Sequence, residues 1–446
     1  MKVLIVGGGG REHTIAWKLS RSPRRPVLYC APGNAGTAVL GENVDIGADQ
    51  VDRLLEFAQR EAIDLTIVGP EDPLCAGIVD RFEAAGLRIF GPRAGGARLE
   101  GDKAFAKQLM KAAGVPTADA RIFAPSDMEI EARRMAGHNV PGDVPARVIR
   151  AYDLAREYVS TRSDPLVVKA SGLARGKGAF VCADPAEALR VIEQLMVDRV
   201  LGEAGDTVVV EERLTGAEVS VLALVDGRSI YLLEPARDYK RLEDGDSGPN
   251  TGGMGAFSPV PSLTEALTRQ LSAEVFVPIV DALRREGIAY RGVLYAGIML
   301  TAGGPKVLEF NCRFGDPETQ PILMRLRTDL LDVIEAVIDE RLDEITLEWD
   351  PRPALCVVLA SGGYPDSAVN GLPISGLAEA AAMPDVEVFH AATRAAGRNV
   401  VTNGGRVLGV TALGETTAAA RERAYQAVRR IRFEGMRFRT DVGIGE

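Results

Sequence analysis

The first hundred residues alternate short apolar runs with amphipathic segments, and this pattern constrains the fold more than any other feature. Runs such as "KVLIVG", "DLTIVG" and "LRIFGP" have the length of buried strands, whereas "VDRLLEFAQREA" has helical spacing. Short strands that alternate with helices predict a parallel sheet covered on both faces. Ligands of such sheets bind beyond the carboxyl ends of the strands, where "GGGGREH", "APGNAG" and "GPEDP" follow here.

Beyond about residue 103 the strands and helices no longer alternate regularly. "DTVVVEERL", "EVSVLALVDG" and "SIYLLEPA" follow one another, which predicts a shared antiparallel sheet. We expect "LEDGDSGPNTGGMGAFSP" to be a long glycine-rich loop and "VTNGGRVLGV" to be a hairpin that turns at Asn403-Gly404. Residues 126–163 are polar and Arg-rich, and we expect one or two helices there.

Composition narrows the class of protein. The 446 residues suggest about three domains, and the formal charge of −10 argues against a general nucleic-acid binder. The five cysteines form no CxxC pair, so neither a zinc ribbon nor a disulfide framework is supported. We find no signal-peptide pattern and no apolar run near the ~18 residues of a membrane span. We therefore expect a soluble intracellular protein without a membrane partner.

Glu309 and Asn311 interrupt the otherwise apolar strand "KVLEFN". Because alternate residues of a strand share a face, the two side chains point the same way. Two hard oxygen donors can bind Mg²⁺ and leave positions open for phosphate oxygens and water. The alternative is a strand end that reaches solvent, where both residues are ordinary.

Two further patterns are typical of nucleotide binding. "VVKASGLARGKG" places Lys169 before a glycine-rich loop whose N–H groups can approach phosphates. The G-x-x-x-x-G-K-[ST] order is absent, and an ordinary hairpin loop that needs glycine explains the pattern equally well. "VVVEERLTGAEVS" places Glu211, Glu212 and Glu218 around a turn that suits adenine and ribose hydroxyls, or that is simply a solvated acidic turn.

The N-terminal "VGGGGREH" is not a dinucleotide fingerprint, because the third glycine position is Glu12 or His13. The second strand also lacks the terminal acid that would hold a ribose. Both points argue against a nicotinamide-dependent oxidoreductase. The residues support a generic anion site instead, in which a glycine turn opens a helix with Arg11 nearby.

Six motifs occur in order along the chain: "GGREH", "APGNAGT", "IVGPEDPL", "GPNTGGMGA", "KVLEFNCRFGDPETQP" and "VVTNGGRVL". Together they resemble the phosphoribosylamine–glycine ligase family of the ATP-grasp superfamily, from Met1 to about Asp441. The resemblance implies an α/β fold with a Rossmann-like parallel-sheet domain, an ATP-grasp module of two α+β lobes and a C-terminal β-rich domain. The expected boundaries are 1–102 for the substrate domain, 103–340 for the module (small lid lobe about 122–197, larger lobe about 198–340) and 341–446 for the last domain.

The resemblance also implies a reaction. Glycine, 5-phosphoribosylamine and ATP would give glycinamide ribonucleotide, ADP and phosphate through a glycyl phosphate, in de novo purine biosynthesis. ATP is the expected co-substrate, and Mg²⁺ or Mn²⁺ the expected cofactor. The expected partners are the small-molecule substrates, and the chain is expected to be a cytoplasmic monomer. A relative that uses formate or bicarbonate and a non-catalytic nucleotide sensor are the other candidates.

Roles carry over residue by residue through the resemblance. It implies metal ligands at Glu309 and Asn311, and catalytic groups near the reacting carboxylate at Arg313 and Asp316. It also implies catalytic groups at Asp238 and Lys240, as part of the glycine and phosphate surroundings. It implies ATP-binding residues at Lys103, Lys169, Gly172, Gly176, Lys177, Gly178, Glu211, Glu212, Leu214 and Glu218. It implies substrate-binding residues at Gly10, Arg11, Glu12, Asn34, Glu71, Asn250, Thr251 and Gly252.

Several positions depart from the family pattern. Gly8 replaces the frequent Asn or Ser, Ser171 replaces Asp, Arg175 replaces a small residue and Tyr239 replaces His. The second acid that many ATP-grasp metal sites carry is Gly297 here. Residues 126–163 form an insertion, which we expect to be a solvated elaboration of the small lobe.

Overall fold

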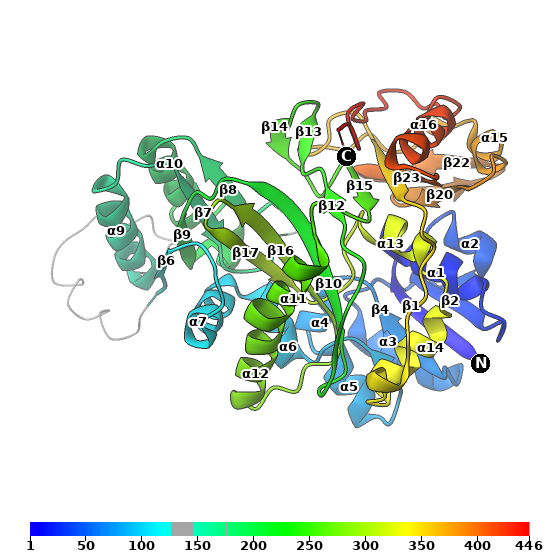
Figure 1. The fold of residues 1–446 in the computed structure, drawn as a ribbon, viewed down its shortest axis with the longest axis horizontal. Helices are drawn as coiled ribbons and strands as arrows, with labels where there is room; N and C mark the ends of the chain where they lie inside the picture. The colour runs from blue at the N-terminus through cyan, green and yellow to red at the C-terminus, as the bar shows by residue number, and fades with distance from the viewer. Residues whose placement is uncertain (126–145, 175–176, 446) are drawn as a thin grey trace. The chain divides into compact units, whose positions relative to one another are not determined.

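The computed structural model describes residues 1–125, 146–174 and 177–445, so Arg175, Gly176 and most of the expected insertion lie outside the described residues. The chain divides into two compact units (Figure 1). The first unit comprises residues 1–97, 218–297 and 311–446, and the second comprises residues 98–217 and 298–310.

The first unit opens with a five-stranded sheet in the order β3-β2-β1-β4-β5, and all its strand pairs are parallel. Its strands are β1 (Lys2–Gly7), β2 (Val27–Pro32), β3 (Glu42–Asn43), β4 (Leu65–Val68) and β5 (Ile89–Phe90). The helices between them are α1 (Gly10–Ser20), α2 (Thr37–Leu40), α3 (Val51–Arg60), α4 (Glu71–Cys75) and α5 (Ile78–Ala84). This is the parallel α/β domain that the alternating pattern predicts.

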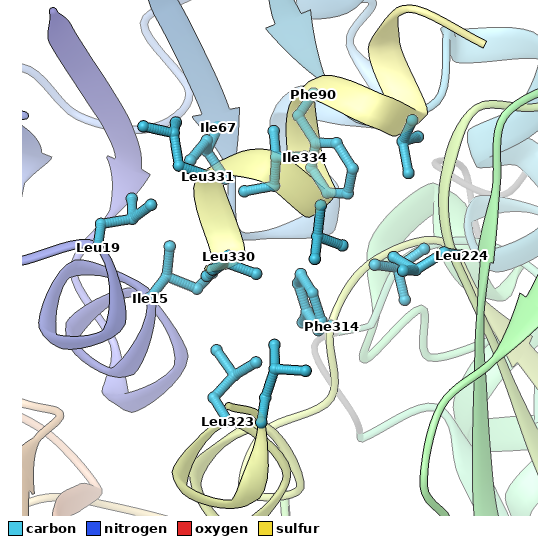
Figure 2. Close-up of a cluster of buried hydrophobic side chains, with 14 of the residues drawn as sticks. Ile15, Leu19, Ile67, Phe90, Leu224, Phe314, Leu323, Leu330, Leu331 and Ile334 are labelled. Carbon is cyan, nitrogen blue, oxygen red and sulfur yellow. The ribbon is translucent and has the colours of Figure 1, made fainter. Parts of the chain in front are cut away.

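One apolar core joins this sheet to later parts of the first unit (Figure 2). Ile15 of α1 and Phe90 of β5 belong to it, together with α13 (Thr319–Arg325) and α14 (Leu330–Ile338). Phe314 lies in the same core and is 4% exposed. Burial of each such side chain stabilises the fold by about 1.5–3 kcal/mol. The turn around Phe314 is therefore held against the N-terminal domain.

The C-terminal part of the first unit is an antiparallel sheet in the order β12-β15-β18-β23-β20 beside a smaller sheet, β19-β22-β21. Its strands are β12 (Arg237–Asp238), β15 (Gly255–Ser258), β18 (Ala354–Ala360), β19 (Pro373–Ile374), β20 (Val386–His390), β21 (Thr393–Ala396), β22 (Asn399–Thr402) and β23 (Arg406–Leu413). Helices α15 (Leu377–Ala381) and α16 (Thr417–Val428) complete it. This agrees with the β-rich domain expected at the C-terminus.

The second unit contains a four-stranded antiparallel sheet in the order β6-β9-β7-β8. Its elements are β6 (Ala120–Phe123), β7 (Leu166–Ala170), β8 (Ala179–Cys182), β9 (Val208–Glu212), α7 (Lys103–Ala113), α9 (Ala146–Ser160) and α10 (Pro185–Met196), and α6 (Ala94–Gly101) runs into it. Val148, Ala151, Ala155 and Val159 of α9 are buried in its core. The described end of residues 126–163 is thus a core helix, and the expectation of a solvated elaboration is wrong there.

Strands β10 (Ala217–Val225), β11 (Ile230–Leu232), β16 (Gly292–Thr301) and β17 (Gly304–Asn311) form a sheet in the order β11-β10-β16-β17. A helix runs from α11 (Glu265–Leu271) through a π segment (Ser272–Phe276) to α12 (Val277–Arg285). Within the described residues, no helix has the length and apolar content needed to cross a membrane.

Three sequence predictions need correction. β9 belongs to a different sheet from β10 and β11, so the three consecutive strands do not form one sheet. The expected glycine-rich loop contains β13 (Arg241–Glu243) and β14 (Ser247–Asn250), which pair with each other. Asn403-Gly404 does not turn a hairpin, because β22 and β23 belong to separate sheets.

Candidate active site

A buried carboxylate between two lysines is the centre of a polar cluster in the second unit. Glu211 on β9 lies 3.1 Å from Nζ of Lys107 and 3.0 Å from Nζ of Lys169. Lys169 Nζ also donates to the backbone carbonyl of Leu308 (2.9 Å), and Lys107 Nζ donates to Thr117 Oγ1 (2.6 Å). Two cations and one anion leave a positive charge, which suits a phosphate. Burial lowers the pKa of Lys107 to about 8.

Lys103 is the first residue of helix α7, which begins beside the end of β7, the strand that carries Lys169. Ser171, at the end of β7, accepts a hydrogen bond from Ala104 N and donates one to the capping carboxylate of Asp102, both at 2.9 Å. The serine that replaces the family's aspartate thus fixes the start of α7. Burial lowers the pKa of the Lys103 ammonium, although the carboxylate of Glu309 opposes the shift.

The described part of the expected phosphate loop is shaped by close packing. A Cβ at Gly172 would lie 2.7 Å from Cα of Ala204, and a Cβ at Gly178 would lie 2.7 Å from Cβ of Ala174. Neither glycine has a positive φ, so a left-handed backbone does not explain the choice of residue. Glycine stands at both positions because there is no space for a Cβ. Lys177 is exposed at the tip, which leaves its ammonium accessible to a ligand.

The remaining residues of the expected adenine edge lie on the surface of the second unit. Glu212 is paired with Lys306 (2.8 Å) and accepts a hydrogen bond from Asp119 N (3.0 Å). The hydrogen bond from Lys306 lowers the pKa of Glu212. Leu214 is half-buried in the loop after β9.

Strand β17 carries both expected metal ligands near its carboxyl end. Glu309 and Asn311 lie on the face opposite Phe310, which is buried, and both are half-buried. One carboxylate and one amide oxygen fit a hard divalent cation, but they supply too few donors to enclose it. No cluster of three or more His, Cys, Asp or Glu side chains able to hold a metal occurs among the residues described. The donor set therefore fits a cation whose coordination is completed by phosphate and water.

At the start of α1, Glu12 folds back over the glycine turn. Its carboxylate accepts hydrogen bonds from Gly9 N and from Nε of Arg11, both at 2.6 Å, and the side chain is buried. A Cβ at Gly7 would lie 2.6 Å from Cγ of Glu12, and one at Gly69 would lie 2.0 Å from its Oε1. These glycines leave the space that Glu12 fills, and Glu12 in turn caps the helix.

Asn34 links the loops after β1 and β2 to the C-terminal sheet. Its Nδ2 donates to the carbonyls of Gly8 (3.0 Å) and His390 (2.9 Å), and its Oδ1 accepts from Gly36 N (2.8 Å). A Cβ at Gly8 would lie 2.5 Å from the carbonyl oxygen of Gly33. This lack of space explains why position 8, which departs from the family pattern, is a glycine.

Charged residues from α1, α4 and the turn after β17 meet in the first unit. Arg313 Nε lies 3.1 Å from Glu71 Oε2. Burial would raise the pKa of Glu71, but the guanidinium groups of Arg313 and Arg11 outweigh it and lower the pKa to about 2. Asp316 accepts hydrogen bonds from Arg11 N (3.4 Å) and Gln320 Nε2 (3.1 Å). The cluster thus contains two carboxylates and two guanidiniums of opposite charge.

Two further residues with predicted roles, Glu218 and Lys240, contact each other in the first unit. Lys240 Nζ lies 3.0 Å from Glu218, so a predicted catalytic lysine and a predicted ATP-binding carboxylate form an ion pair. The Lys240 carbonyl accepts from Thr251 N (2.7 Å) and Thr251 Oγ1 (2.9 Å). Asp238 is half-buried on β12, and Asn250 is exposed at the end of β14.

Comparison with known proteins decides the family. Models described as phosphoribosylglycinamide synthetase N domain, ATP-grasp (A) domain and C domain match residues 1–100, 132–319 and 354–445. Phosphoribosylamine–glycine ligase of Rhodopirellula baltica is 48% identical over 99% of this chain and 96% of its own length. That of Caldanaerobacter subterraneus is 46% identical over the whole of both chains.

The chain belongs to the phosphoribosylamine–glycine ligase family. It is an ATP-grasp ligase of purine biosynthesis. A crystal structure of phosphoribosylamine–glycine ligase from Thermotoga maritima has a TM-score of 0.79 at 33% identity and covers 99% of this chain and all of that one. The biotin carboxylase domain of Hydrogenobacter thermophilus 2-oxoglutarate carboxylase, at 16% identity over 98% and 91% of the two chains, shares the fold with a TM-score of 0.67.

Sequence reasoning missed Arg406 of this ligase. It opens β23 and donates from Nη1 to the backbone carbonyls of Asp316 (2.7 Å), Gly253 (3.5 Å) and Gly252. Burial would raise the pKa of Asp316, but Arg406 and Arg11 outweigh it and lower the pKa. The "TNGGRVL" motif contains this arginine, but the Asn-Gly pair in it predicts a hairpin turn.

A buried hydroxyl network was also missed. Glu318 Oε1 accepts hydrogen bonds from Ser220 on β10 and Tyr295 on β16, both at 3.0 Å, and all three residues are buried. The hydroxyls lie 2.9 Å apart. Burial, reinforced by the carboxylate, raises the pKa of Tyr295 well above its usual value. The network holds the turn that carries Asp316, and no local pattern connects its three members.

Proposed function

We propose that this ligase makes glycinamide ribonucleotide through a glycyl phosphate, with ATP and Mg²⁺. The observation that carries the proposal is the net positive cluster of Lys107, Lys169 and Glu211, with Lys103 at the start of α7. A carboxylate is a poor acyl donor, and its phosphorylation requires positioned cations rather than a nucleophile from the protein. Lys169 and Lys103 would neutralise the phosphates, and Glu211 holds Lys169 in place.

Glu309 and Asn311 would hold the cation, which, when bound, neutralises charge on the transferring phosphate. Both side chains lie on the face of β17 opposite Phe310 and are half-buried. Both donors are hard oxygens, which suit Mg²⁺ and Mn²⁺ alike, so Mn²⁺ would fit the same pair. Glu211–Leu214 would bind adenine, and Glu218 the ribose, as the family resemblance implies.

In the first unit, Arg313 and Asp316 would act on glycine and on the attacking amine. The lowered pKa of Asp316 keeps its carboxylate anionic, so it can accept a hydrogen bond from an amine. Arg313, held by Glu71 at 3.1 Å, would bind the carboxylate of glycine. Gly10, Arg11, Glu12 and Asn34 would shape the loop that receives phosphoribosylamine, and Asn250–Gly252, with Asp238 and Lys240, would complete the glycine surroundings.

The test is release of ADP by the purified chain with each substrate set. We expect ADP only when glycine and phosphoribosylamine, generated in situ from ribose 5-phosphate and ammonia, are both present. Equal turnover with formate or bicarbonate in place of glycine would assign the chain to a different ATP-grasp reaction. Binding of ATP without turnover under every condition would identify a nucleotide sensor.

We further propose a monomer that acts in the cytoplasm, with domain boundaries near residues 102 and 340. Light scattering during gel filtration tests the oligomeric state, since a dimer would have twice the 47.6 kDa of the chain. Limited proteolysis tests the boundaries. Cleavage concentrated inside one of the three expected domains, rather than near residues 102 and 340, would contradict the boundaries.

A further inference from the structure

The guanidinium of Arg406 is only partly used by the protein. Its hydrogen bonds to Gly252, Gly253 and Asp316 all leave from Nη1, and the Asp316 carboxylate lies 3.6 Å from the same nitrogen. Within the described part of the chain, Nε and Nη2 donate to no partner. An arginine has five N–H donors, so this leaves an edge of the fork for another acceptor.

That edge is accessible to a ligand. The Arg406 side chain is 23% exposed although its backbone opens a central strand of the C-terminal sheet. A Cβ at Gly252 would lie 3.2 Å from Nη2 and 3.3 Å from Nε, so the absence of a side chain there keeps both nitrogens uncovered. Tyr364 also holds Gly252, because its hydroxyl accepts a hydrogen bond from Gly252 N at 2.9 Å.

Arg406 is tied to the loop that is proposed to receive phosphoribosylamine. Asp316, which Arg406 contacts, also accepts a hydrogen bond from Arg11 N at the start of α1. A Cβ at Gly10 would lie 3.6 Å from Asp316 Oδ1, so the first turn of α1 and Arg406 approach the same carboxylate. The carboxylate of Asp316 raises the pKa of Arg406 against the effect of burial, which keeps the guanidinium charged.

We infer that Arg406 binds the 5-phosphate of phosphoribosylamine through Nε and Nη2, while Nη1 holds the glycine-rich turn at Gly252–Gly253. The inference rests on the proposed function. A phosphate monoester carries more charge than the carboxylate of glycine, and its oxygens match the fork of a guanidinium in a bidentate contact. Arg406 would thus be a specificity residue that the C-terminal domain supplies for the ribonucleotide.

Binding of the stable product, compared with its phosphate-free analogue, isolates this contact. We expect Arg406→Met to weaken binding of glycinamide ribonucleotide by about 10–100-fold and to leave glycinamide riboside, which wild type should bind weakly, almost unaffected. Arg406→Lys keeps the charge but not the fork, so an intermediate loss is expected. Arg423→Met is the matched control, because Arg423 is a half-buried arginine on α16 that pairs with Asp385.

Steady-state kinetics distinguish the two anionic substrates. The KM for phosphoribosylamine should rise in Arg406→Met and Arg406→Lys, with little change in the KM for glycine. An equal loss of affinity for ribonucleotide and riboside, or a rise in the glycine KM alone, would overturn the inference. If Arg406→Met fails to fold, Arg406→Lys decides by the same criteria. Absence of ADP release by wild type would instead contradict the proposed function.

Discussion

Gly8 shows how one missing side chain can shape a substrate loop. A Cβ there would lie 2.5 Å from the carbonyl oxygen of Gly33, a distance at which backbone must move. We expect Gly8→Ser to destabilise the chain by about 1–3 kcal/mol and to raise the KM for phosphoribosylamine more than that for ATP. Gly303→Ser is the control, because a Cβ there would meet only Thr301 Oγ1 at 3.8 Å. Wild-type stability and KM values in Gly8→Ser would contradict this account.

Glu309 is the single carboxylate of the proposed metal platform on β17. Glu309→Gln keeps the size of the side chain and removes its charge, so turnover should fall by about 100-fold and the magnesium dependence should shift to higher concentration. Initial rates measured across a magnesium titration give both quantities. Glu274→Gln, on an exposed helical face, should behave as wild type. A normal rate at every magnesium concentration would remove Glu309 from the metal site.

At the scale of elements, Ser171 connects the end of β7 to the start of α7. Ser171→Ala removes one hydrogen bond to Ala104 N and one to Asp102, each at 2.9 Å, which should cost about 1–2 kcal/mol locally. We expect faster amide exchange over the first turn of α7 and a higher KM for ATP, because Lys103 lies in that turn. Ser160→Ala, at the exposed end of α9, is the control. Unchanged exchange in α7 would mean that the cap at Asp102 suffices alone.

Local patterns predicted most elements but not the partners of the strands. The alternation of strands and helices in residues 1–100 is sufficient to predict the parallel sheet, because each βα unit must pack beside the previous one. β9 and β10 are consecutive in sequence yet belong to different sheets. Long-range packing determines the sheet that each strand joins. Asn403-Gly404 has the composition of a hairpin turn but links β22 to β23 in separate sheets. Because the local residues predict only a turn, they do not predict a role for Arg406.

For the whole molecule, the sequence predicts residues that a local motif marks better than it predicts the distant partners of those residues. The sequence predicts Lys169 at a phosphate because the lysine lies at a strand end and precedes glycines. Its partners Glu211 and Leu308 are brought to it by strand pairing and by β17, which no local window contains. Glu12 and Asn34 are predicted to bind substrate, and their buried hydrogen bonds also shape the loops on which they lie.

The contact between α1 and β20 should make the first unit sensitive to acid. His13 on α1 accepts a hydrogen bond from His390 N at 2.7 Å, and the two rings lie 5.5 Å apart. Burial, with a smaller contribution from the charge of His390, lowers the pKa of His13 to about 3, and burial lowers that of His390 to about 4. Both imidazoles are therefore neutral in the folded chain at neutral pH.

The sign of the pH effect follows from proton binding. Below pH ~6.5 the unfolded chain binds protons at both imidazoles that the folded chain does not, so the free energy of unfolding should fall by about 1.4 kcal/mol per pH unit for each. The carboxylates with lowered pKa, such as Glu71, add to this loss only below their unfolded values near 4.5. Urea denaturation between pH 7 and about 5 thus reports the histidines. His13→Asn keeps an acceptor for His390 N and should halve the slope, whereas an unchanged slope would show that other groups cause it.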